Sequence, residues 1–305
     1  CNSTIKVSKI KELANFTKKN MVIAVSGASG FIGKTLVRIL QRKDWTVRII
    51  IRDSFSLPDQ DFLSQNIEGA DVVINLAGAP VAKKWTPDYM KEIIASRVTT
   101  TRKISDAINL AKRKPALFIS TSAIGIYDSK ETHTETSLSF GNTFLSKVCI
   151  EWEHEARLAE ISTRVVIFRL GMVLGNDGGA LDKMQRLFRI GLGGKLGSGE
   201  QAVSFIHIND LMNAFIFAIE NENLRGIVNA VSPFPSYNAE FTDKLGKVFN
   251  QPTWIAVPAF ILKKLYGEGA QVMLDGQKVI PEKLMNAGFK FSFPTIQNAL
   301  VNIFS

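Results

Sequence analysis

The chain of 305 residues is 46% hydrophobic and carries 37 Lys and Arg residues against 28 Asp and Glu residues, a formal net charge of +9. This composition suits one large domain or two closely joined ones, excludes a disordered or fibrous protein, and gives a general attraction for anionic partners. With only two cysteines, and with Arg169 and Pro258 interrupting VVIFRLGMVL and WIAVPAFIL, we expect a soluble cytoplasmic protein without a disulfide framework or a membrane-spanning segment.

A glycine-rich turn follows the first predicted core strand. Residues 1–20 precede it, and we expect them to form an appended helix or arm. The stretch VIAVSGASGFIG over 22–33 predicts a strand, a tight turn with glycines at Gly27, Gly30 and Gly33, and the start of a helix. This spacing is close to the dinucleotide fingerprint, in which the pyrophosphate approaches the glycine backbone and lies on the helix N-terminus. We therefore predict a nucleotide site here rather than an ordinary turn.

Strands and helices alternate over the rest of the first half. We expect strands at 21–27, 46–52, 71–78, 116–123 and 163–171, and helices at 34–43, about 88–113 and about 143–160. This alternation predicts an α/β fold, a Rossmann-type doubly wound parallel sheet with helices on both faces. Because ligands bind beyond the carboxyl ends of such strands, the segments SGASG, IRDS, NLAGAP, STSA and RLGMVLG are the expected walls of one cleft.

The second half changes character past Gly175, where glycine-dense and then proline-punctuated segments predict a smaller, more irregular α+β lobe. We place the nucleotide-binding domain at 21–180, with 203–231 returning to it, and the lobe on the substrate side at 181–202 and 232–305. In the returning part, we expect the strand VSFIHI and the following helix to rejoin the main sheet, with Asp210 as the helix N-cap.

Ordered sequence blocks connect these elements to a known family. They run from Val22 to the C-terminus and comprise SGASGFIG, VINLAGAP, KKWT, SRVTTTRKISDAI, TSAIGIY, FLSKVCIEWE, RLGMVLGNDGGAL, FRIGLGGKLGSGEQ, IHINDL, VNAVSP, NAEF, GQKVIP and AGFKF. On these blocks the chain resembles the extended short-chain dehydrogenase/reductase superfamily, and within it the atypical epimerase-family branch with a C-terminal lobe of unassigned function. The resemblance implies a Rossmann-type fold that binds a nicotinamide nucleotide, and it implies much less about the reaction.

The usual catalytic set of that superfamily is absent. Its acid is a Tyr whose pKa is lowered by a Lys four residues later and by the nicotinamide ribose, while a Ser or Thr holds the substrate oxygen. Here Lys147 matches the lysine, but Thr143 occupies the tyrosine position and Ala123 the hydroxyl position. The remaining catalytic candidates are Tyr127, Lys147 and His207, and a histidine before a helix is more often structural than catalytic.

Arg52 ends the second strand about 20 residues beyond the glycine turn, where an arginine accommodates the 2′-phosphate of NADP and an acid binds the ribose of NAD. Asp53 follows directly, but relatives that resemble this chain carry Arg at the strand end, so we favour NADP(H) over NAD(H); a surface arginine is the alternative. The resemblance associates Glu92 and Arg97 with the cofactor, although an opposite-charge pair on a solvated helix face is an equal alternative. The expected cofactor-binding residues are Gly27, Ala28, Ser29, Gly30, Phe31, Ile32, Gly33, Arg52, Asp53, Leu76, Ala77, Gly78, Glu92, Arg97, Ser122 and Leu174.

Other partners are not indicated. No cluster has metal-ligand spacing, Cys149 is expected to be a core thiol, and Trp85 and Trp152 are expected to pack, with Trp85 closer to the cleft. Basic residues are scattered at helix ends, so we expect no nucleic-acid and no membrane partner. Two functions are favoured over a third, a structural scaffold. One is an NADP(H)-dependent oxidoreductase or epimerase, monomeric or homodimeric, acting on a small polar, sugar-like substrate between the lobes; the other is a non-catalytic protein that senses the NADP(H) pool.

Overall fold

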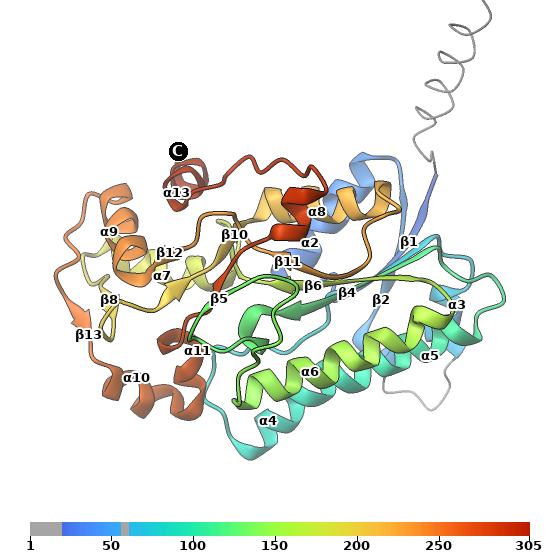
Figure 1. Cartoon of the computed structure of the whole chain (residues 1–305), viewed down its shortest axis with the longest axis horizontal. Coiled ribbons are helices and arrows are strands. Elements are labelled where there is room, and N and C mark those ends of the chain that lie inside the picture. The colour runs from blue at the N-terminus through green and yellow to red at the C-terminus, as the bar shows by residue number, and fades with distance from the viewer. Residues whose placement is uncertain (1–19, 56–60) are drawn as a thin grey trace, which may run out of the picture.

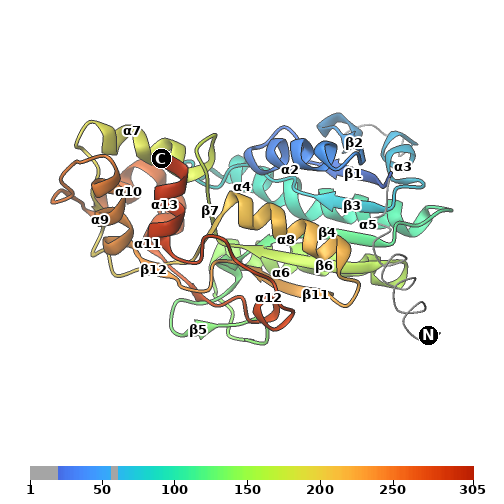
Figure 2. The ribbon, with the colours of Figure 1, turned by 90° about the horizontal axis from the view of Figure 1, so that it is seen from above.

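The central sheet has six parallel strands in the order β11-β6-β4-β3-β1-β2. The computed structural model describes residues 20–55 and 61–305 (Figures 1 and 2). The strands are β1 (Val22–Ser26), β2 (Thr46–Ile50), β3 (Val72–Asn75), β4 (Leu117–Ala123), β6 (Arg164–Leu170) and β11 (Gly226–Ala230). From β1 the chain builds the sheet first toward β2 and then, through β3, in the other direction. The topological switch point therefore lies between β1 and β3, next to the glycine turn.

Helices cover both faces of this sheet, as the expected βαβ pattern requires. They are α2 (Phe31–Arg42), α3 (Asp61–Ile67), α4 (Pro87–Ile94), α5 (Thr100–Leu110), α6 (Phe144–Arg157) and α8 (Ile208–Glu220). The helix expected over 88–113 is α4 and α5 joined by a π-helical turn, η2 (Ala95–Thr99). Short 3₁₀ turns are η1 (Arg52–Phe55), η3 (Ile124–Ile126), η4 (Leu158–Ile161) and η5 (Gly267–Ala270).

Two apolar layers hold the sheet between these helices. Side chains alternate along each strand, so Ile23 and Val25 of β1 join the layer under α2 and α8, while Ala24 joins the layer under α3, α5 and α6. All four residues of β3 are buried, as is typical of a parallel strand covered on both faces. Figure 1 shows α2 and α8 on one side of the strands and α5 and α6 on the other.

The lobe is assembled from short strand pairs and helices that, apart from β5, come after β6 in the chain. Its strands are β5 (Thr132–His133), β7 (Met172–Leu174), β8 (Lys195–Leu196), β9 (Ala202–Val203), β10 (Phe205–His207), β12 (Ser236–Tyr237), β13 (Ala256–Val257) and β14 (Lys278–Val279). Its helices are α7 (Gly179–Arg189), α9 (Asn238–Val248), α10 (Ala259–Tyr266), α11 (Gln271–Leu274), α12 (Glu282–Asn286) and α13 (Ile296–Phe304). A separate apolar core joins α7, α9 and α13. Figure 2 shows the lobe at one end of the sheet.

Two details of the returning segment differ from the expectation. Phe205–His207 does not rejoin the main sheet but pairs with β7, and the sixth strand is Gly226–Ala230 after α8. The N-cap of α8 is His207 rather than Asp210. Asp210 lies in the first turn of α8, and its carboxylate accepts the backbone N–H groups of Ser292 and Phe293 at 2.9 Å each. Asp210 thus anchors the C-terminal segment instead of the helix. The domain boundaries themselves stay a prediction.

In the described part of the chain, no helix combines the length and the apolar character that crossing a membrane would require.

Candidate nucleotide site

Each glycine of the turn after β1 has a different reason to lack a side chain. Gly27 has φ +70°, and a Cβ there would lie 2.6 Å from the backbone carbonyl carbon and oxygen of Leu76 at the end of β3. A Cβ on Gly33 would lie 2.2 Å from the carbonyl oxygen of Gly27. At Gly30 a Cβ would meet only the Gly27 oxygen, at an ordinary 3.4 Å. Gly27 and Gly33 are therefore required by the fold, whereas Gly30 leaves open space for a ligand.

The start of α2 offers backbone donors to that space. Its N-cap is Gly30, which has no side chain to accept the N–H groups of the first turn. Such uncapped N–H groups, with the helix dipole, form an anion site. The ring of Phe31 packs against the backbone of Gly175 and Gly178, where an added Cβ would lie 2.7 and 3.1 Å from the ring atoms. The glycines of GNDGG therefore make room for Phe31, which fixes the loop after β7 beside the turn.

A buried polar network holds the ends of β1 and β3 together beneath the turn. The Ser26 hydroxyl donates to Asn75 Oδ1 at 2.6 Å, and the same oxygen accepts the N–H of Ala77 at 3.2 Å. Asn75 Nδ2 donates to Thr101 Oγ1 at 2.7 Å, which also accepts Trp152 Nε1–H at 2.8 Å. Each polar group is satisfied in a low-dielectric interior, so the network fixes the strand ends that face a ligand. Sequence reasoning missed this network, because nothing in the pattern marks which polar residues meet.

Arg52 lies where the sequence placed it, after β2 and free of the core. Its side chain is 85% exposed, and Nη2 forms an ion pair with Glu92 Oε1 at 3.4 Å. Asp53 follows in the 3₁₀ turn η1 and is also exposed. An exposed ion pair of this kind is weak, so the guanidinium can exchange Glu92 for a phosphate.

Arg97 and Glu92 do not pair with each other, although both lie on the helical segment after β3. Arg97 sits in the π-helical turn and donates to the carbonyl oxygens of Ala79 at 2.9 Å and Ile93 at 3.4 Å. Its guanidinium lies 5.3 Å from the Trp152 ring centroid, and burial lowers the pKa of Arg97. A Cβ on Gly78 would lie 3.2 Å from this guanidinium. The structure thus brings a cation against the end of β3, beside the small residues expected to approach the cofactor.

Ser122 and Tyr127 belong to a buried charged network and not to an open site. Ser122 Oγ donates to Glu153 Oε1 at 2.8 Å, and Arg169 holds Glu153 with two hydrogen bonds of 2.7 Å. Arg169 Nη1 also donates to the Tyr127 hydroxyl at 2.7 Å, and that hydroxyl lies 3.0 Å from Asn229 Oδ1. Tyr127 is 1% exposed, and burial raises its pKa despite the neighbouring Arg169. These contacts fit a structural role for both side chains.

The Glu153–Arg169 pair was missed by sequence reasoning. Burial disfavours the charged guanidinium, but the hydrogen bonds and attraction of Glu153 outweigh this and raise the pKa of Arg169. The available signal was an arginine in an otherwise apolar strand, RVVIFRL, which requires a buried partner. The neighbouring Cys149 is a core thiol as expected, and burial raises its pKa to about 11.

Thr143 has a structural function that accounts for its place in the sequence. It is the N-cap of α6, and its hydroxyl accepts the N–H of Ser146 at 3.1 Å. Ser146 Oγ in turn accepts the N–H of Thr143 at 2.8 Å, which completes a reciprocal capping arrangement. Lys147 follows on the first turn of α6 and is exposed. Of the three catalytic candidates, only Lys147 presents its side chain to solvent.

His207 and Leu174 face each other across the β7–β10 pair and are both buried. His207 Nδ1 accepts the N–H of Asn209 at 3.1 Å as the helix N-cap, so Nε2 carries the proton. Burial lowers the pKa of His207 to about 4, which keeps the ring neutral at pH 7. Leu174 lies in the apolar core of the lobe, so only its backbone is available to a ligand.

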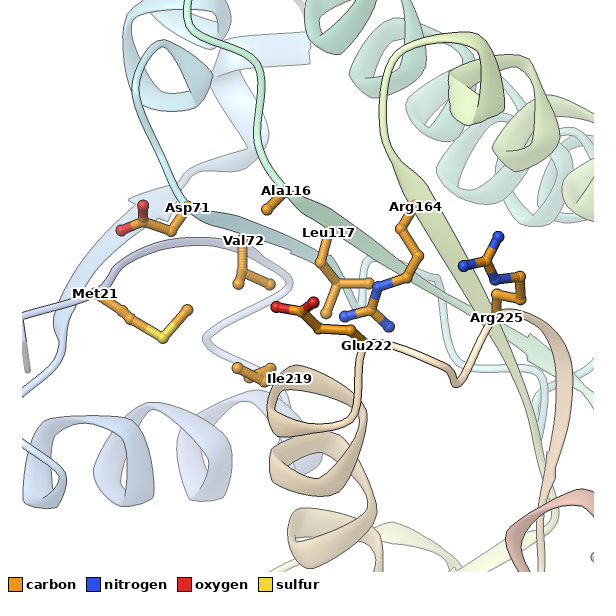
Figure 3. Close-up of a pocket in the computed structure, with 9 residues that line it drawn as sticks. All are labelled: Met21, Asp71, Val72, Ala116, Leu117, Arg164, Ile219, Glu222 and Arg225. Carbon is orange, nitrogen blue, oxygen red and sulfur yellow. The ribbon is translucent and has the colours of Figure 1, made fainter. Parts of the chain in front are cut away.

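Two cavities of the described structure lie away from the glycine turn. One cavity, of about 300 Å³, lies at the amino-terminal ends of the central strands, far from the turn that follows β1. Figure 3 shows Asp71, Leu117 and Arg164 on its wall, at or just before the starts of β3, β4 and β6. Another, of about 520 Å³, is a polar hollow in the lobe between β5, β9 and β14, with Lys130 and Lys278 on its wall. Neither contains a residue of the glycine turn. No group of three or more His, Cys, Asp or Glu side chains within 20–55 and 61–305 is arranged to hold a metal ion.

The fold and the turn define a nucleotide-binding protein of the short-chain dehydrogenase/reductase type. The NAD dependent epimerase/dehydratase family matches residues 23–230, and the chain belongs to this family. A domain of unknown function, DUF1731, matches residues 257–303.

Similar proteins come from plants, bacteria and animals. The chain is 38% identical to the chloroplastic SDR39U1 homologue of Arabidopsis thaliana, over 93% of this chain and 86% of that protein. It is also 38% identical to an epimerase family protein of Staphylococcus saprophyticus, over 92% and 98%. The crystal structure of human SDR39U1 with NADPH superposes with a TM-score of 0.85 at 32% identity, over 93% of this chain and 99% of that one. A UDP-glucuronic acid 4-epimerase from Bacillus cereus, at 19% identity and a TM-score of 0.75, shares the fold.

Replacing Gly30 tests the open space at the turn. We expect Gly30→Val to abolish NADPH binding, because the side chain fills the volume needed by the pyrophosphate, and to leave the chain folded. Gly27→Val should instead lower the melting temperature, since its Cβ meets the Leu76 backbone. Fluorescence transfer to NADPH and thermal melting measure both effects. Normal NADPH binding by a folded Gly30→Val protein would show that the glycine turn does not bind the pyrophosphate.

Tyr127→Phe separates a structural from a catalytic tyrosine. Loss of the hydroxyl leaves a buried Arg169 donor unpaired, so we expect the free energy of unfolding to fall by about 1–3 kcal/mol. NADPH affinity should stay unchanged. The exposed Tyr237→Phe is the control, with a change below about 0.5 kcal/mol. Unchanged stability together with lost turnover would contradict the structural assignment.

The depressed pKa of His207 predicts a pH dependence of stability. Between about pH 6.5 and 4 the unfolded chain binds a proton that the folded chain does not, so stability falls as pH falls through this window. The shift corresponds to roughly 3 kcal/mol. His207→Asn keeps a capping acceptor without titrating, and denaturant unfolding at pH 7 and pH 4 should show a smaller loss. The exposed His154→Asn should match the parent; identical losses in all three proteins would refute the assignment.

Proposed function

We propose that the chain binds NADP(H) in preference to NAD(H) and acts as an oxidoreductase or epimerase on a small polar, sugar-like substrate. The observation that carries the cofactor preference is Arg52, 85% exposed at the end of β2 with only a weak partner in Glu92. A guanidinium in this place forms a planar, charge-assisted contact with a 2′-phosphate. The NADPH complex of the human relative supports the same preference.

Different residues around the turn are suited to different parts of a dinucleotide. The uncapped start of α2 and the open space at Gly30 would hold the pyrophosphate, and Arg52 would hold the 2′-phosphate. The backbone from Leu76 to Gly78 borders the adenosine side, with Arg97 behind it. When bound, the nicotinamide supplies or accepts a hydride. The substrate lies between this domain and the lobe.

Proton transfer requires a group other than the usual tyrosine. Thr143 caps α6, and an aliphatic hydroxyl is far less acidic than a phenol. Tyr127 and His207 are both closed from solvent. The exposed Lys147 and a water bound to the substrate are the groups that remain, and we assign the proton step to one of them.

A non-catalytic sensor of the NADP(H) pool is the second candidate. It is favoured by one observation, the commitment of Thr143, Ser122 and Tyr127 to structural hydrogen bonds. A nucleotide site without a proton donor binds the cofactor and performs no turnover, so a search for activity decides between the two.

Arg52→Ala tests the cofactor preference. We expect NADPH affinity to fall about 10- to 100-fold, as for loss of a charge-assisted hydrogen bond of about 1.5–3 kcal/mol, and NADH affinity to stay unchanged. Glu92→Gln should raise NADPH affinity up to about fivefold, because Arg52 loses a competing partner. Arg42→Ala, at the far end of α2, is the control. Equal calorimetric affinities of the parent for NADPH and NADH would refute the proposal.

Thr143→Asn tests the chemistry, because asparagine keeps the N-cap and removes the hydroxyl. In the enzyme, this variant should retain turnover within about threefold, whereas removing the true acid lowers the rate about 10²–10⁴-fold. Lys147→Met is the companion variant, measured with the same NADPH oxidation assay. A large loss in Thr143→Asn with normal NADPH binding would return the proton step to Thr143.

A further inference from the structure

Helix α10 leaves most of its apolar residues outside the core. Its sequence is AFILKKLY, yet Leu262 is its only buried residue. Phe260 is 69% exposed, Leu265 61% and Ile261 38%. At 100° per residue these three side chains and Lys264 lie within an arc of about 140°, and the buried Leu262 lies outside this arc. A short helix with such an outward apolar side is typical of a surface that binds a partner.

More exposed apolar side chains belong to the segments that adjoin α10. Trp254 is 83% exposed, Ile190 66%, Leu192 54% and Ile255 43%. Ile190 and Leu192 precede β8, Trp254 and Ile255 precede β13, and these two strands pair with each other. A second contact joins the same two parts of the chain, because the Arg189 guanidinium lies 5.2 Å from the Phe249 ring centroid. Figures 1 and 2 both show α10 at the same end of the lobe as α9. We call this region the α10 face, made of Ile190, Leu192, Trp254, Ile255, Phe260, Ile261 and Leu265.

Lys and Arg residues outnumber acids in the segments around the α10 face, although Asp182, Glu200, Asp243 and Glu268 border these segments. Residues 183–199 contain four Lys and Arg residues and no Asp or Glu, and residues 244–267 contain another four with no Asp or Glu. Some of these cations pair with acids on their own helices, as Lys247 does with Asp243. Within the described ranges, Lys263 and Lys264 form no ion pair and are exposed. The fold therefore gathers cations that look scattered along the sequence.

We propose that the α10 face binds the surface of an anionic lipid bilayer. Apolar and aromatic side chains with lysines beside them are the features of an interfacial helix, whose apolar side enters the headgroup boundary while the lysines meet anionic lipids. A second copy of the chain fits less well, because a twofold contact would place these like charges together. A nucleic acid fits less well, because only two of the seven side chains of the face, Trp254 and Phe260, offer a ring on which a base could stack.

This proposal revises the expectation that membranes are not partners. It concerns peripheral binding and is independent of the cofactor site. The turn η5, which directly follows α10, packs on the nucleotide domain: a Cβ on Gly269 would lie 2.5 Å from the carbonyl oxygen of Lys83. The lobe is thus anchored from within while α10 faces outward.

Vesicle binding by the full chain tests the proposal. Trp254 is a built-in probe, because the other three tryptophans are at most 8% exposed. We expect sedimentation with vesicles of phosphatidylcholine and phosphatidylglycerol in equal amounts, a blue shift of tryptophan emission, and little binding to phosphatidylcholine alone. Added salt should weaken the binding, since exposed charges are screened.

Variants assign the binding to the α10 face. Lys263→Gln with Lys264→Gln should lower the partition coefficient about 25-fold, about fivefold for each lysine near an anionic surface. Phe260→Ser with Leu265→Ser should abolish the blue shift. The matched control is Leu138→Ser with Ile161→Ser, which removes side chains that are 84% and 85% exposed on other surfaces. Retained NADPH binding and unchanged melting confirm that each variant is folded.

Three results would overturn the proposal. The first is failure of the parent protein to bind the anionic vesicles. The second is equal vesicle binding by the α10-face variants and the control. The third is self-association in sedimentation velocity that Phe260→Ser with Leu265→Ser abolishes, together with absent vesicle binding, because this would assign the face to a second copy of the chain.

Discussion

The close approach of the turn after β1 to the end of β3 is the constraint on which the nucleotide site depends. Only a glycine fits at position 27, where any Cβ meets the Leu76 backbone. The hydrogen bond between Ser26 and Asn75 holds the same two strands from below. Because the turn cannot move away from β3, the start of α2 is fixed beside the switch point of the sheet. The open space at Gly30 therefore lies at a fixed place at the start of this helix.

A second constraint is the buried Glu153–Arg169 ion pair, which uses polar side chains for stability that could otherwise serve a reaction. The buried Glu153–Arg169 pair ties α6 to β6 and holds the hydroxyls of Ser122 and Tyr127. An ion pair in such an interior requires full hydrogen bonding on both sides, because an unpaired buried charge is strongly destabilising. The Ser122 hydroxyl supplies a further donor to Glu153, and the Tyr127 hydroxyl supplies a further acceptor to Arg169. The family fold is therefore retained while two polar groups near the end of β4 form hydrogen bonds within the core.

The sequence predicted the fold and the glycine turn well for a physical reason. Strand, turn and helix patterns are local, and the spacing of Gly27, Gly30 and Gly33 states directly where a backbone must approach a ligand or another strand. Contacts between residues far apart in the chain have no comparable local pattern in the sequence. The Asn75–Thr101 hydrogen bond, the Arg52–Glu92 ion pair and the anchoring of residues 292–293 by Asp210 join segments that only the tertiary fold brings together. The capping role of Thr143 is local, but it was obscured by comparison with a tyrosine at that position. The α10 face was missed because its cations are dispersed along the chain.

The central claim is that the glycine turn and Arg52 together receive a phosphorylated dinucleotide at the switch point of the sheet. A crystal structure of the full chain grown with NADPH tests it most directly. We expect the pyrophosphate within hydrogen-bond distance of the first-turn N–H groups of α2, and the 2′-phosphate on the Arg52 guanidinium with the Glu92 contact broken. A well-ordered NADPH whose 2′-phosphate lies in solvent while Arg52 stays paired with Glu92, or whose pyrophosphate lies away from Gly30, would contradict it.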